Sequence, residues 1–217
     1  MAPSTRPATD APSAPRRRYR SQRRAEQAQE TRSALLQAAT NLFTTRGWSA
    51  TGMRDIAEEA GVATETVYSH FGSKAELFQR VVDAAVGGDE APVTVAERPE
   101  FALIGEGARG ERIAAAAHLT TQIHDRTAGL AKVLREAAAG DEAIADMLSA
   151  TRERQRLDVE AGASLLMGRA PAANERDGLW ALLSVEVYLL LVEVTGWSPA
   201  TYEAWLAETL ELLVPRS

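Results

Sequence analysis

Apolar residues recur at intervals of three and four positions along most of this 217-residue chain, and this spacing limits the possible folds more than any other feature. Gly47 supplies a stop signal for the first clear stretch. The apolar members of that stretch are Leu35, Ala38, Ala39, Leu42 and Phe43. No segment alternates polar and apolar residues for long enough to build a sheet, and no repeat occurs at a fixed period. The sequence therefore predicts an all-α protein.

Helix signals continue beyond this first stretch. Thr51 is expected to cap a short helix that carries Ile56 and ends at Gly61, and Ser73 is expected to cap another that runs to residue 86. Between them lies a third short helix, Thr64–Phe71. Later helices are expected at residues 113–124, 130–138, 142–167, 175–194 and 200–213, with glycine or proline at most joints.

Charge divides the chain into two parts of opposite sign. Up to Val86 there are 12 basic and 9 acidic residues, and beyond it 12 basic and 21 acidic residues, so a net charge of +3 is followed by one of −9. Six of the arginines fall between Arg16 and Arg24. A basic beginning and an acidic body indicate different tasks for the two parts.

Composition excludes several classes of protein. The hydrophobic and charged fractions, 45% and 25%, are typical of a soluble globular protein. Because the chain has no cysteine, it cannot contain a disulfide, a thiol nucleophile or a thiolate metal site. No segment supplies the roughly 20 uninterrupted apolar residues of a membrane span. These features predict a cytoplasmic protein without a membrane partner.

The first residues are rich in proline and small polar side chains, which cannot bury enough apolar surface to order the chain. Their arginine and serine content resembles that of an organelle transit peptide, but the prolines would break the amphipathic helix that such a peptide needs. We expect a disordered basic arm over residues 1–26 and a helical domain over residues 27–86. A flexible linker over 87–110 and a second helical domain over 111–217 are expected to follow.

Residues 53–71 have the parts of a helix-turn-helix unit, whose second helix enters the major groove of DNA. Ala57 is small where the two helices cross, Gly61 can take the positive φ of the turn, and Val62 fills the gap. The residues expected to anchor the unit on the first helix are Ile56, Val67 and Phe71. The same pattern also fits an ordinary helical hairpin with a polar surface, so geometry alone leaves both interpretations open.

The stretch from Ala34 to Ala84 contains the phrases LLQAATNLFTTRGW and MRDIAEEAGVATETVYSHFGSKAELF. It resembles the DNA-binding domain of the TetR family of bacterial transcriptional regulators. The resemblance implies an all-helical homodimer in which three N-terminal helices bind an operator. A divergent C-terminal domain would bind a small ligand that releases the DNA. A looser resemblance covers residues 196–210, which are similar to the closing helix of many such regulators.

Carried over by position, the resemblance makes Thr64–Phe71 the recognition helix. The residues that it implies as DNA contacts are Arg54, Thr64, Thr66, Tyr68, Ser69, His70 and Lys74. Two positions depart from the family pattern. Ala63 stands where the family usually has Ser or Thr, so we expect the cap to shift to Thr64. Glu65 stands where it often has Gly, and its carboxylate either accepts from a cytosine amino group or faces solvent.

The arginine-rich arm also fits this resemblance, because flexible basic arms neutralise phosphates or enter the minor groove. A solubilising tail explains the same composition, so this alternative stays open.

Residues 105–110, GEGARG, spell the G-x-G-x-x-G pattern of a dinucleotide-binding turn. That turn needs a parallel strand roughly 30 residues later and an acidic residue about 20 residues onward. Alanine-rich helix follows instead, and Asp125 comes too early. We therefore interpret these glycines as a hinge between domains and predict no cofactor.

Catalytic and metal sites have no other support. His118 and His124 lie six positions apart, which turns them about 240° from each other on a helix, so they form no two-histidine metal face. The chain has neither the Glu-x-x-His pair of a di-iron bundle nor a serine in a nucleophile elbow. The sequence predicts that the protein is not an enzyme.

The segment 179–194 is apolar almost all round, and such a helix needs a partner on more than one side. The resemblance implies that this partner is the equivalent helix of a second subunit, with residues 200–213 completing a four-helix interface. Trp197, Tyr202 and Trp205 would anchor the interface or close the core of the monomer. A homodimer suits a near-palindromic double-stranded operator.

A ligand pocket is expected among the C-terminal helices. Its candidate residues, which combine polar tips with apolar walls, are His118, Gln122, Trp180 and Tyr188. Each also fits a core or surface role. Few buried charges suggest an uncharged or lipophilic small-molecule effector.

The sequence thus predicts a DNA-binding regulator, a repressor released by its effector. The alternative is a helical small-molecule-binding protein or enzyme on the same fold without specific operator binding.

Overall fold

The computed structural model describes the backbone of residues 14–215 and the side chains of residue 23 and of residues 26–215. Across this part of the chain every regular element is helical and there is no strand, which confirms the all-α prediction. The helices of the first half are α1 Ala14–Arg46, α2 Met53–Glu59, α3 Thr64–Phe71 and α4 Lys74–Gly87. Three short segments follow: η1 Val95–Glu97, α5 Pro99–Ala102 and η2 Leu103–Gly105. The second half comprises α6 Arg109–Ala138, α7 Glu142–Met167, α8 Ala173–Leu182, α9 Val185–Tyr188, the π-helical turn η3 Leu189–Val194 and α10 Pro199–Leu213.

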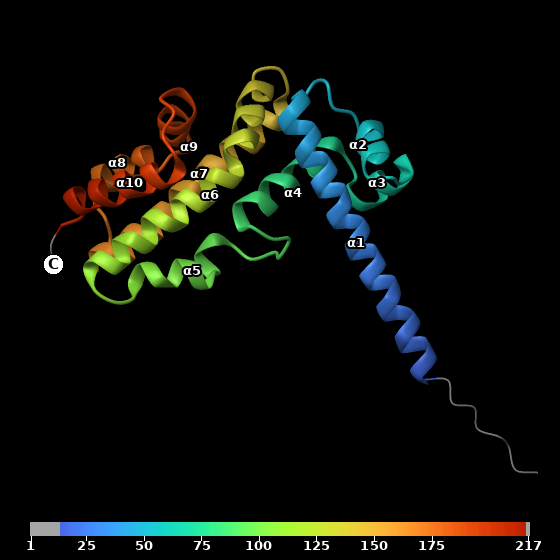
Figure 1. Cartoon of the computed structure of the whole chain (residues 1–217), viewed down its shortest axis with the longest axis horizontal. Helices are drawn as coiled ribbons and strands as arrows, with labels where there is room; N and C mark the ends of the chain where they lie inside the picture. Colours follow the sequence, from blue (N-terminus) through green and yellow to red (C-terminus); the bar gives the residue numbers. More distant parts are fainter. Residues whose placement is uncertain (1–13, 216–217) are drawn as a thin grey trace, which may run out of the picture.

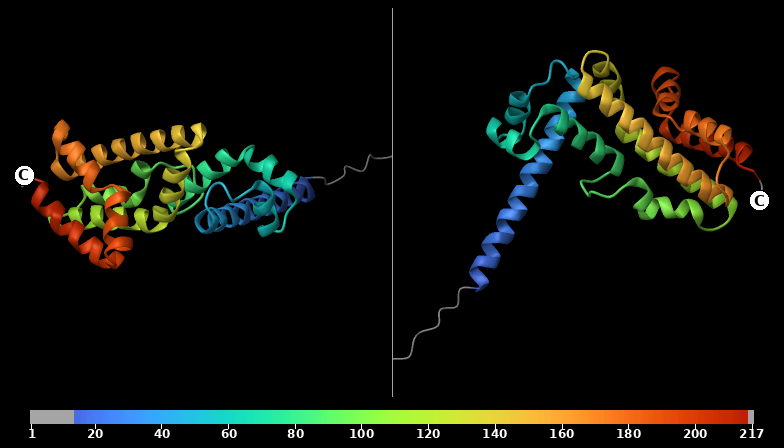
Figure 2. Two further views of the ribbon diagram at one scale, coloured as in Figure 1. Left: turned by 90° about the horizontal axis from the view of Figure 1, so that it is seen from above. Right: turned by 180° about the vertical axis from the view of Figure 1, so that it is seen from behind.

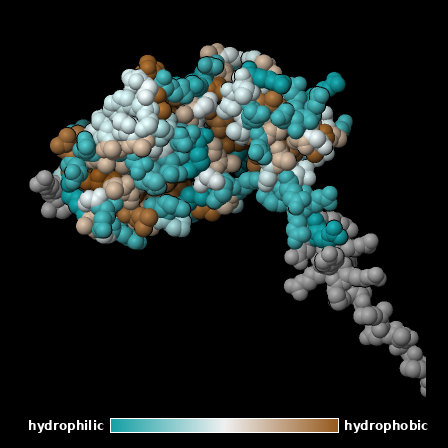
Figure 3. Space-filling view, viewed as in Figure 1, coloured by the Kyte–Doolittle hydropathy of each residue, from teal (hydrophilic) through white to brown (hydrophobic). Residues whose placement is uncertain are grey.

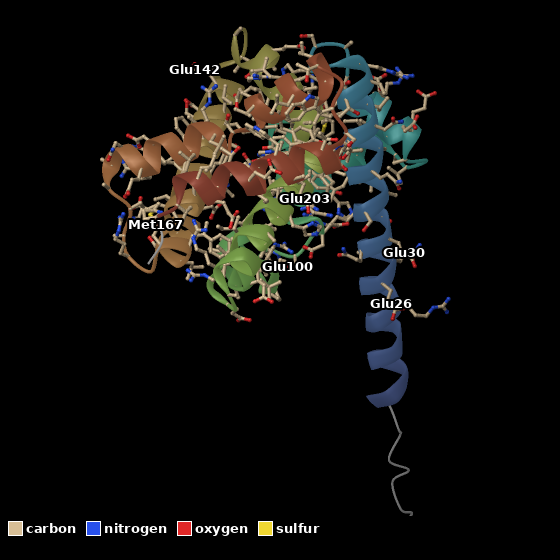
Figure 4. The ribbon with its side chains drawn as sticks, turned by 60° about the vertical axis from the view of Figure 1, so that its left-hand side comes forward. Glu26, Glu30, Glu100, Glu142, Met167 and Glu203 are labelled. Carbon is tan, nitrogen blue, oxygen red and sulfur yellow. The ribbon has the colours of Figure 1, made fainter. Side chains whose placement is uncertain are left out.

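The helices form two connected groups (Figure 1). Helices α2 and α3 pack beside the C-terminal part of α1, and α4 runs from this group toward α6. Helices α6 and α7 pair along their length, and α8, α9 and α10 cover them at the far end. The N-terminal part of α1 stands clear of the other helices in the view from behind (Figure 2, right). Glu26 and Glu30 lie on this free stretch (Figure 4).

One hydrophobic core joins the N-terminal helices to the adjoining ends of α6 and α7. Phe43 and Phe78 are fully buried there, with ring centroids 4.8 Å apart in an edge-to-face arrangement, and Trp48 packs against both. Leu130 on α6 and Ile144 on α7 belong to the same core. Helices α6 and α7 therefore share a packed core with the N-terminal helices at this end.

A second core lies among α6, α7 and the C-terminal helices, and Tyr202 of α10 is its largest fully buried side chain. The ring of Tyr202 meets that of Tyr188 at 4.9 Å and that of Trp205 at 5.9 Å. These contacts place Tyr202 in the core of the monomer rather than at an interface with a second subunit.

Three arginines of α6 donate hydrogen bonds to carbonyl groups at the C-terminal ends of other helices. The last carbonyls of a helix have no amide partner within that helix. Arg109 donates to the carbonyls of Glu211 and Val214 at 2.8 and 2.7 Å, at the end of α10. Arg112 donates to the carbonyls of Leu165 and Leu166 near the end of α7. Helix α6 therefore ties the ends of its neighbours to itself.

Arg126 is the third of these arginines. Its guanidinium donates to the carbonyl of Ala85 at 2.9 Å and to that of Val86 at 3.1 Å, in the last turn of α4. This places a cation at the negative end of the α4 dipole. It links the core of the C-terminal half directly to the helix that follows the helix-turn-helix.

Several predicted helix bounds are confirmed, among them Thr64–Phe71 and residues 142–167. The expected Thr51 cap is wrong, because Gly52 is the N-cap residue of α2 and the Thr51 hydroxyl donates to the carbonyls of Leu42 and Gly47. Ser73 caps α4 as expected, because its hydroxyl accepts from the amide of Glu76. The prediction of a break between residues 124 and 130 is wrong, since α6 continues through Gly129. A Cβ at Gly129 would lie 3.2 Å from the Thr44 side chain, so the glycine marks a close approach of α1 and α6 instead.

The single helix expected over residues 175–194 is also wrong. The chain leaves helical geometry at Leu183 and Ser184 and restarts at Val185. The carbonyl of Leu183 accepts from Gln155 of α7 at 3.1 Å, and His124 of α6 also bonds to the Leu183 backbone. The Ser184 hydroxyl donates to the carbonyl of Ala181. Side chains from helices distant in the sequence thus form hydrogen bonds with backbone groups that a continuous helix would pair internally.

The expected linker over residues 87–110 is not an open chain, because it contains η1, α5 and η2 and buries Phe101 and Ile104. The expected disordered arm is corrected from Ala14 onward, where the backbone is helical. Residues 16–46 contain neither proline nor glycine and are rich in good helix formers, and Pro15 is tolerated in a first turn. Residues 1–13 lie outside the described residues. The division into domains stays a prediction.

Within the described range, none of the helices combines the length and the apolar character that crossing a membrane requires.

Candidate functional site

Helices α2 and α3 form the helix-turn-helix geometry that the sequence predicted. Gly61 has a φ of +69° in the turn, and the amide of Val62 donates to the carbonyl of Ala57 at 2.9 Å. Ala57 is 2% exposed at the helix crossing. The expected anchors Ile56, Val67 and Phe71 are all buried. The inward faces of the two helices are therefore buried by packing, and the opposite face of α3 is accessible to a partner.

The start of α3 differs from the expectation. Ala63 is the N-cap residue, and its extended backbone leads directly into Thr64 as the first helical residue. No side chain caps the helix, so the expected shift of the cap to Thr64 is wrong. The amide of Thr66 donates to the carbonyl of Ala63 at 2.9 Å and closes the first turn without a hydroxyl.

The outward face of α3 carries the predicted contact residues. Tyr68 is 52% exposed, and Ser69 is exposed with its hydroxyl donating to the carbonyl of Thr66. Thr64, Thr66 and His70 are partly exposed, and Glu65 points to solvent. Arg54 is exposed on α2. These groups form a polar surface of hydroxyls, an imidazole and a guanidinium, which suits phosphates and base edges.

Lys74 differs from the other candidates because its ammonium group has partners within the protein. Nζ donates to the carbonyl of Trp48 and lies 3.9 Å from the centroid of the Trp48 ring. Burial lowers the pKa of Lys74, while the charges of Asp141 and Asp55 oppose this shift. Trp48 in turn donates from Nε1 to Asp141 Oδ2 at 3.2 Å, and Asp141 caps α7. Lys74 therefore connects the DNA-binding unit to the start of α7.

The arginines between Arg16 and Arg24, apart from exposed Arg23, have side chains outside the described residues. The phosphate contacts expected of this arm stay a prediction.

A cavity of about 890 Å³ lies between the two groups of helices. Helices α4, α6 and α7 form its walls, and the segment 89–95 crosses one side. Arg32 and Leu36 of α1 also line it, so the cavity reaches the DNA-binding unit itself. Its interior is mainly apolar, with residues such as Leu119, Ile123 and Leu166. This combination of size and lining is that of a small-molecule site.

Ion pairs hold the segment beside the cavity in place. Glu90 pairs with Arg32 at 3.2 Å and also accepts from Gln29 and Ser33 of α1. Asp89 receives two hydrogen bonds of 2.9 Å from Arg98, and these bonds, followed by one from the Ala91 amide, lower the pKa of Asp89 to about 2. The segment is thus fastened both to α1 and to the start of α5.

A sequence model of the family described as "Bacterial regulatory proteins, tetR family" matches residues 35–81, which cover the end of α1, the helix-turn-helix and the first part of α4. Over 59 residues the chain is 48% identical to the HTH-type transcriptional regulator TtgR of Pseudomonas putida. Over 101 residues it is 39% identical to the HTH-type transcriptional repressor Rv3405c of Mycobacterium tuberculosis. Residues 35–81 therefore carry the DNA-binding domain of the TetR family. These matches cover 27% and 44% of this chain and only 28% and 48% of the two relatives.

Solved structures extend the likeness to the TetR fold as a whole. NalD of Pseudomonas aeruginosa superposes with a TM-score of 0.64 at 20% identity, over 88% of this chain and 98% of NalD. A TetR-family regulator from Rhodococcus gives a TM-score of 0.62 at 17% identity, over 86% of this chain and all of that one. At such low identity the likeness concerns the fold, and it covers a much larger share of this chain than the matches to the two relatives do.

The four predicted ligand residues do not line the large cavity. His118 is exposed and bonds to Glu203 of α10 at 3.0 Å, and Gln122 lies one turn further along the same side, beside Arg126. Tyr188 is buried and donates to Asp125 at 2.9 Å. Trp180 lines a smaller pocket of about 380 Å³. On α6 the cavity side carries Thr120, Ile123, His124 and Thr127 instead, and a ligand role for the four residues stays a prediction.

His124 is the buried polar group that the sequence did not single out for this wall. It is 3% exposed, and its Nδ1 lies 3.3 Å from the hydroxyl of Tyr202. Burial lowers the pKa of His124 to about 4, although the hydrogen bond with the Leu183 backbone opposes the shift. The imidazole is therefore neutral near pH 7 and forms a rigid, uncharged part of the cavity wall.

Proposed function

We propose that this chain is a DNA-binding transcriptional regulator, and specifically a repressor that a small molecule releases from its operator. The observation that carries the proposal is the polar outward face of α3 on a helix-turn-helix whose other face is buried. The sequence match to the TetR family covers the same unit. Rv3405c, which is described as a repressor, supports the direction of regulation. No feature of the described residues favours the alternative of an enzyme on the same fold.

The proposal includes a homodimer that binds a near-palindromic operator. Exposed apolar side chains on the C-terminal elements support it: Leu190 is 57% and Val194 75% exposed, and Leu212 is 87% exposed. Figure 3 shows apolar side chains at the surface of this half of the molecule. A second copy would bury such groups, and two recognition helices one helical turn of DNA apart would read both halves of the site.

The effector site in this proposal is the cavity between α4, α6 and α7. Because α1 and α4 contribute to its wall, a bound molecule would touch the DNA-binding unit directly. Arg126 provides a second connection, since it holds the last turn of α4 to α6. A ligand that prefers one spacing of α4 and α6 would shift the population of DNA-binding conformations by its difference in affinity for the two states.

The test is a fluorescence-anisotropy titration with the DNA upstream of the protein's own gene, with scrambled DNA as competitor and at two salt concentrations. Sequence-selective binding that weakens steeply with salt is expected. Tyr68→Ala should weaken selective binding at least about tenfold, since contacts to bases carry the discrimination. Leu103→Ala is the matched control, because Leu103 is similarly exposed at 50% but lies on η2. If Tyr68→Ala binds as tightly as the control, α3 is not the recognition helix.

Unselective binding to every DNA offered, including fragments selected from a random pool, would overturn the regulator in favour of the helical small-molecule-binding protein.

A further inference from the structure

Charged side chains around the 890 Å³ cavity are almost all paired with one another. Arg32 pairs with Glu90, Asp89 with Arg98, and Arg154 reaches Asp83 of α4 at 3.7 Å. His124 is neutral near pH 7. The two charges of each pair largely cancel. The electrostatic potential inside the cavity therefore depends on the charged side chains that form no ion pair.

Two charged groups at the cavity, Arg80 and Asp158, form no hydrogen bond or ion pair with a described residue. They differ in exposure. Arg80 is exposed on α4, so water screens its charge. Asp158 is only partly exposed on the cavity side of α7, one turn beyond Gln155 and one turn before Gly162, which also line the cavity. The unscreened charge in the cavity wall is therefore a single carboxylate.

Asp158 is only partly exposed, and this burial raises the pKa of its carboxyl because the ionised form loses hydration, while the charge of Arg154 lowers it. The carboxylate forms no hydrogen bond or ion pair with any described residue. A partly desolvated carboxylate without a partner is costly, and a ligand that brings a hydrogen-bonding cation removes that cost.

We propose that the cavity binds a lipophilic monocation, an amine with an extended apolar body, whose ammonium group pairs with Asp158. The inference rests on the proposed effector-responsive function and names the class of effector. The apolar body lies between α6 and α7 against residues such as Leu119, Ile123 and Leu166, and the ammonium group donates to the Asp158 carboxylate. It narrows the expectation of an uncharged or lipophilic effector to a lipophilic molecule with a positive charge.

The test uses three probes with the same apolar chain and different head groups: decylamine, decanol and decanoate. Each is titrated calorimetrically into the full-length protein without DNA, below its aggregation concentration. Decylamine should bind about ten- to a hundredfold more tightly than decanol, as expected for one charge-assisted hydrogen bond in a partly desolvated site. Decanoate should bind most weakly, because its carboxylate repels that of Asp158.

Asp158→Asn should remove the preference for the amine and leave the affinity for decanol unchanged, whereas Asp158→Glu should retain the preference. Asp146→Asn is the matched control, because Asp146 is exposed on the same helix outside the cavity. The thermal unfolding midpoint of Asp158→Asn should equal or exceed that of the wild type, since the change removes an unpaired charge, and this reading verifies folding independently of the ligand.

Three results would overturn the inference: no binding of decylamine to the wild type, equal affinities for amine and alcohol, or an unchanged preference in a folded Asp158→Asn protein. Because the calorimetry contains no DNA, these results are independent of operator binding. A protein that selects the amine but binds no operator would contradict the proposed regulator and leave the ligand class standing.

Discussion

Lys74 could act only as a contact to phosphate or also as part of the folded structure, and these two roles predict different effects of its removal on stability. A surface cation that only contacts phosphate would contribute nothing to the stability of the free protein. Lys74 instead lies on the Trp48 ring and donates to the Trp48 carbonyl. Lys74→Ala should therefore lower the free energy of unfolding by about 1–2 kcal/mol, through the lost cation–π contact and hydrogen bond. Urea unfolding measures the difference.

Arg54→Ala provides the comparison for this prediction, because Arg54 is exposed on α2 and forms no hydrogen bond or ion pair with the described residues. Its stability should stay within about 0.5 kcal/mol of the wild type. Equal stability of the two variants would mean that Lys74 is a free surface cation.

His124 makes the stability of the protein depend on pH. In the unfolded chain its pKa returns to about 6.5, whereas in the folded protein burial holds the pKa at about 4. The unfolded state therefore binds a proton between these values and the folded state does not, so stability is lost as the pH falls from about 6.5 to 4. The loss from this residue amounts to roughly 3 kcal/mol over that range. Urea unfolding at a series of pH values measures it.

His124→Gln should flatten this pH dependence, even though it lowers stability near pH 7. His70→Gln, the same substitution at a partly exposed histidine of α3, should keep the wild-type slope. Parallel curves for wild type and His124→Gln would show that the buried imidazole is not the titrating group.

At the scale of helices, two glycines that lie within helices should respond in opposite ways to a side chain. A Cβ at Gly178 of α8 would meet no atom within 4 Å, whereas at Gly129 of α6 it would lie 3.2 Å from Thr44. Gly178→Ala should stabilise the protein by about 0.5–1 kcal/mol through helix propensity. Gly129→Leu should destabilise it by at least about 2 kcal/mol, because the larger side chain separates α1 from α6. Thermal unfolding of both variants checks the signs, and stabilisation by Gly129→Leu would refute the close approach.

The same glycine shows which parts of the fold the sequence could predict. Bounds such as Thr64–Phe71 depend on signals within a few residues, and local periodicity was enough to predict them. A glycine that ends a helix and a glycine at a helix crossing look alike in sequence, because the difference lies in a partner such as Thr44, 85 positions away. The break at Leu183 likewise depends on Gln155 and His124, which only tertiary packing brings to its backbone.

The two candidate sites also differ in how well the sequence could predict their residues. The outward-facing residues of α3 follow from one short motif whose inward positions are recognisable by their apolar character. The cavity residues depend on which face of α6 packs against α7 rather than α10, and that choice is not encoded within α6 alone. Candidates chosen for their chemistry, such as His118, therefore lie outside the cavity lining, and Asp158 carried no local signal.

At the scale of the whole molecule, the proposed regulator requires two copies of the chain. Leu190 and Val194 lie one turn apart in η3 and are the kind of exposed apolar pair that a second subunit would cover. Replacing both by Lys should dissociate the dimer, because charged groups at a buried interface lose their hydration without gaining a partner. Sedimentation velocity should then report the 23.4 kDa monomer instead of a species of twice that mass.

Loss of the dimer also has a consequence for DNA. A monomer presents one copy of α3 and contacts about half as many phosphates, so the slope of log affinity against log salt concentration should fall by about half. Leu103→Lys is the control, since it adds a charge at an exposed leucine on η2 and should leave both mass and slope unchanged. A dimeric Leu190→Lys, Val194→Lys protein with the wild-type slope would place the subunit interface elsewhere on the C-terminal half.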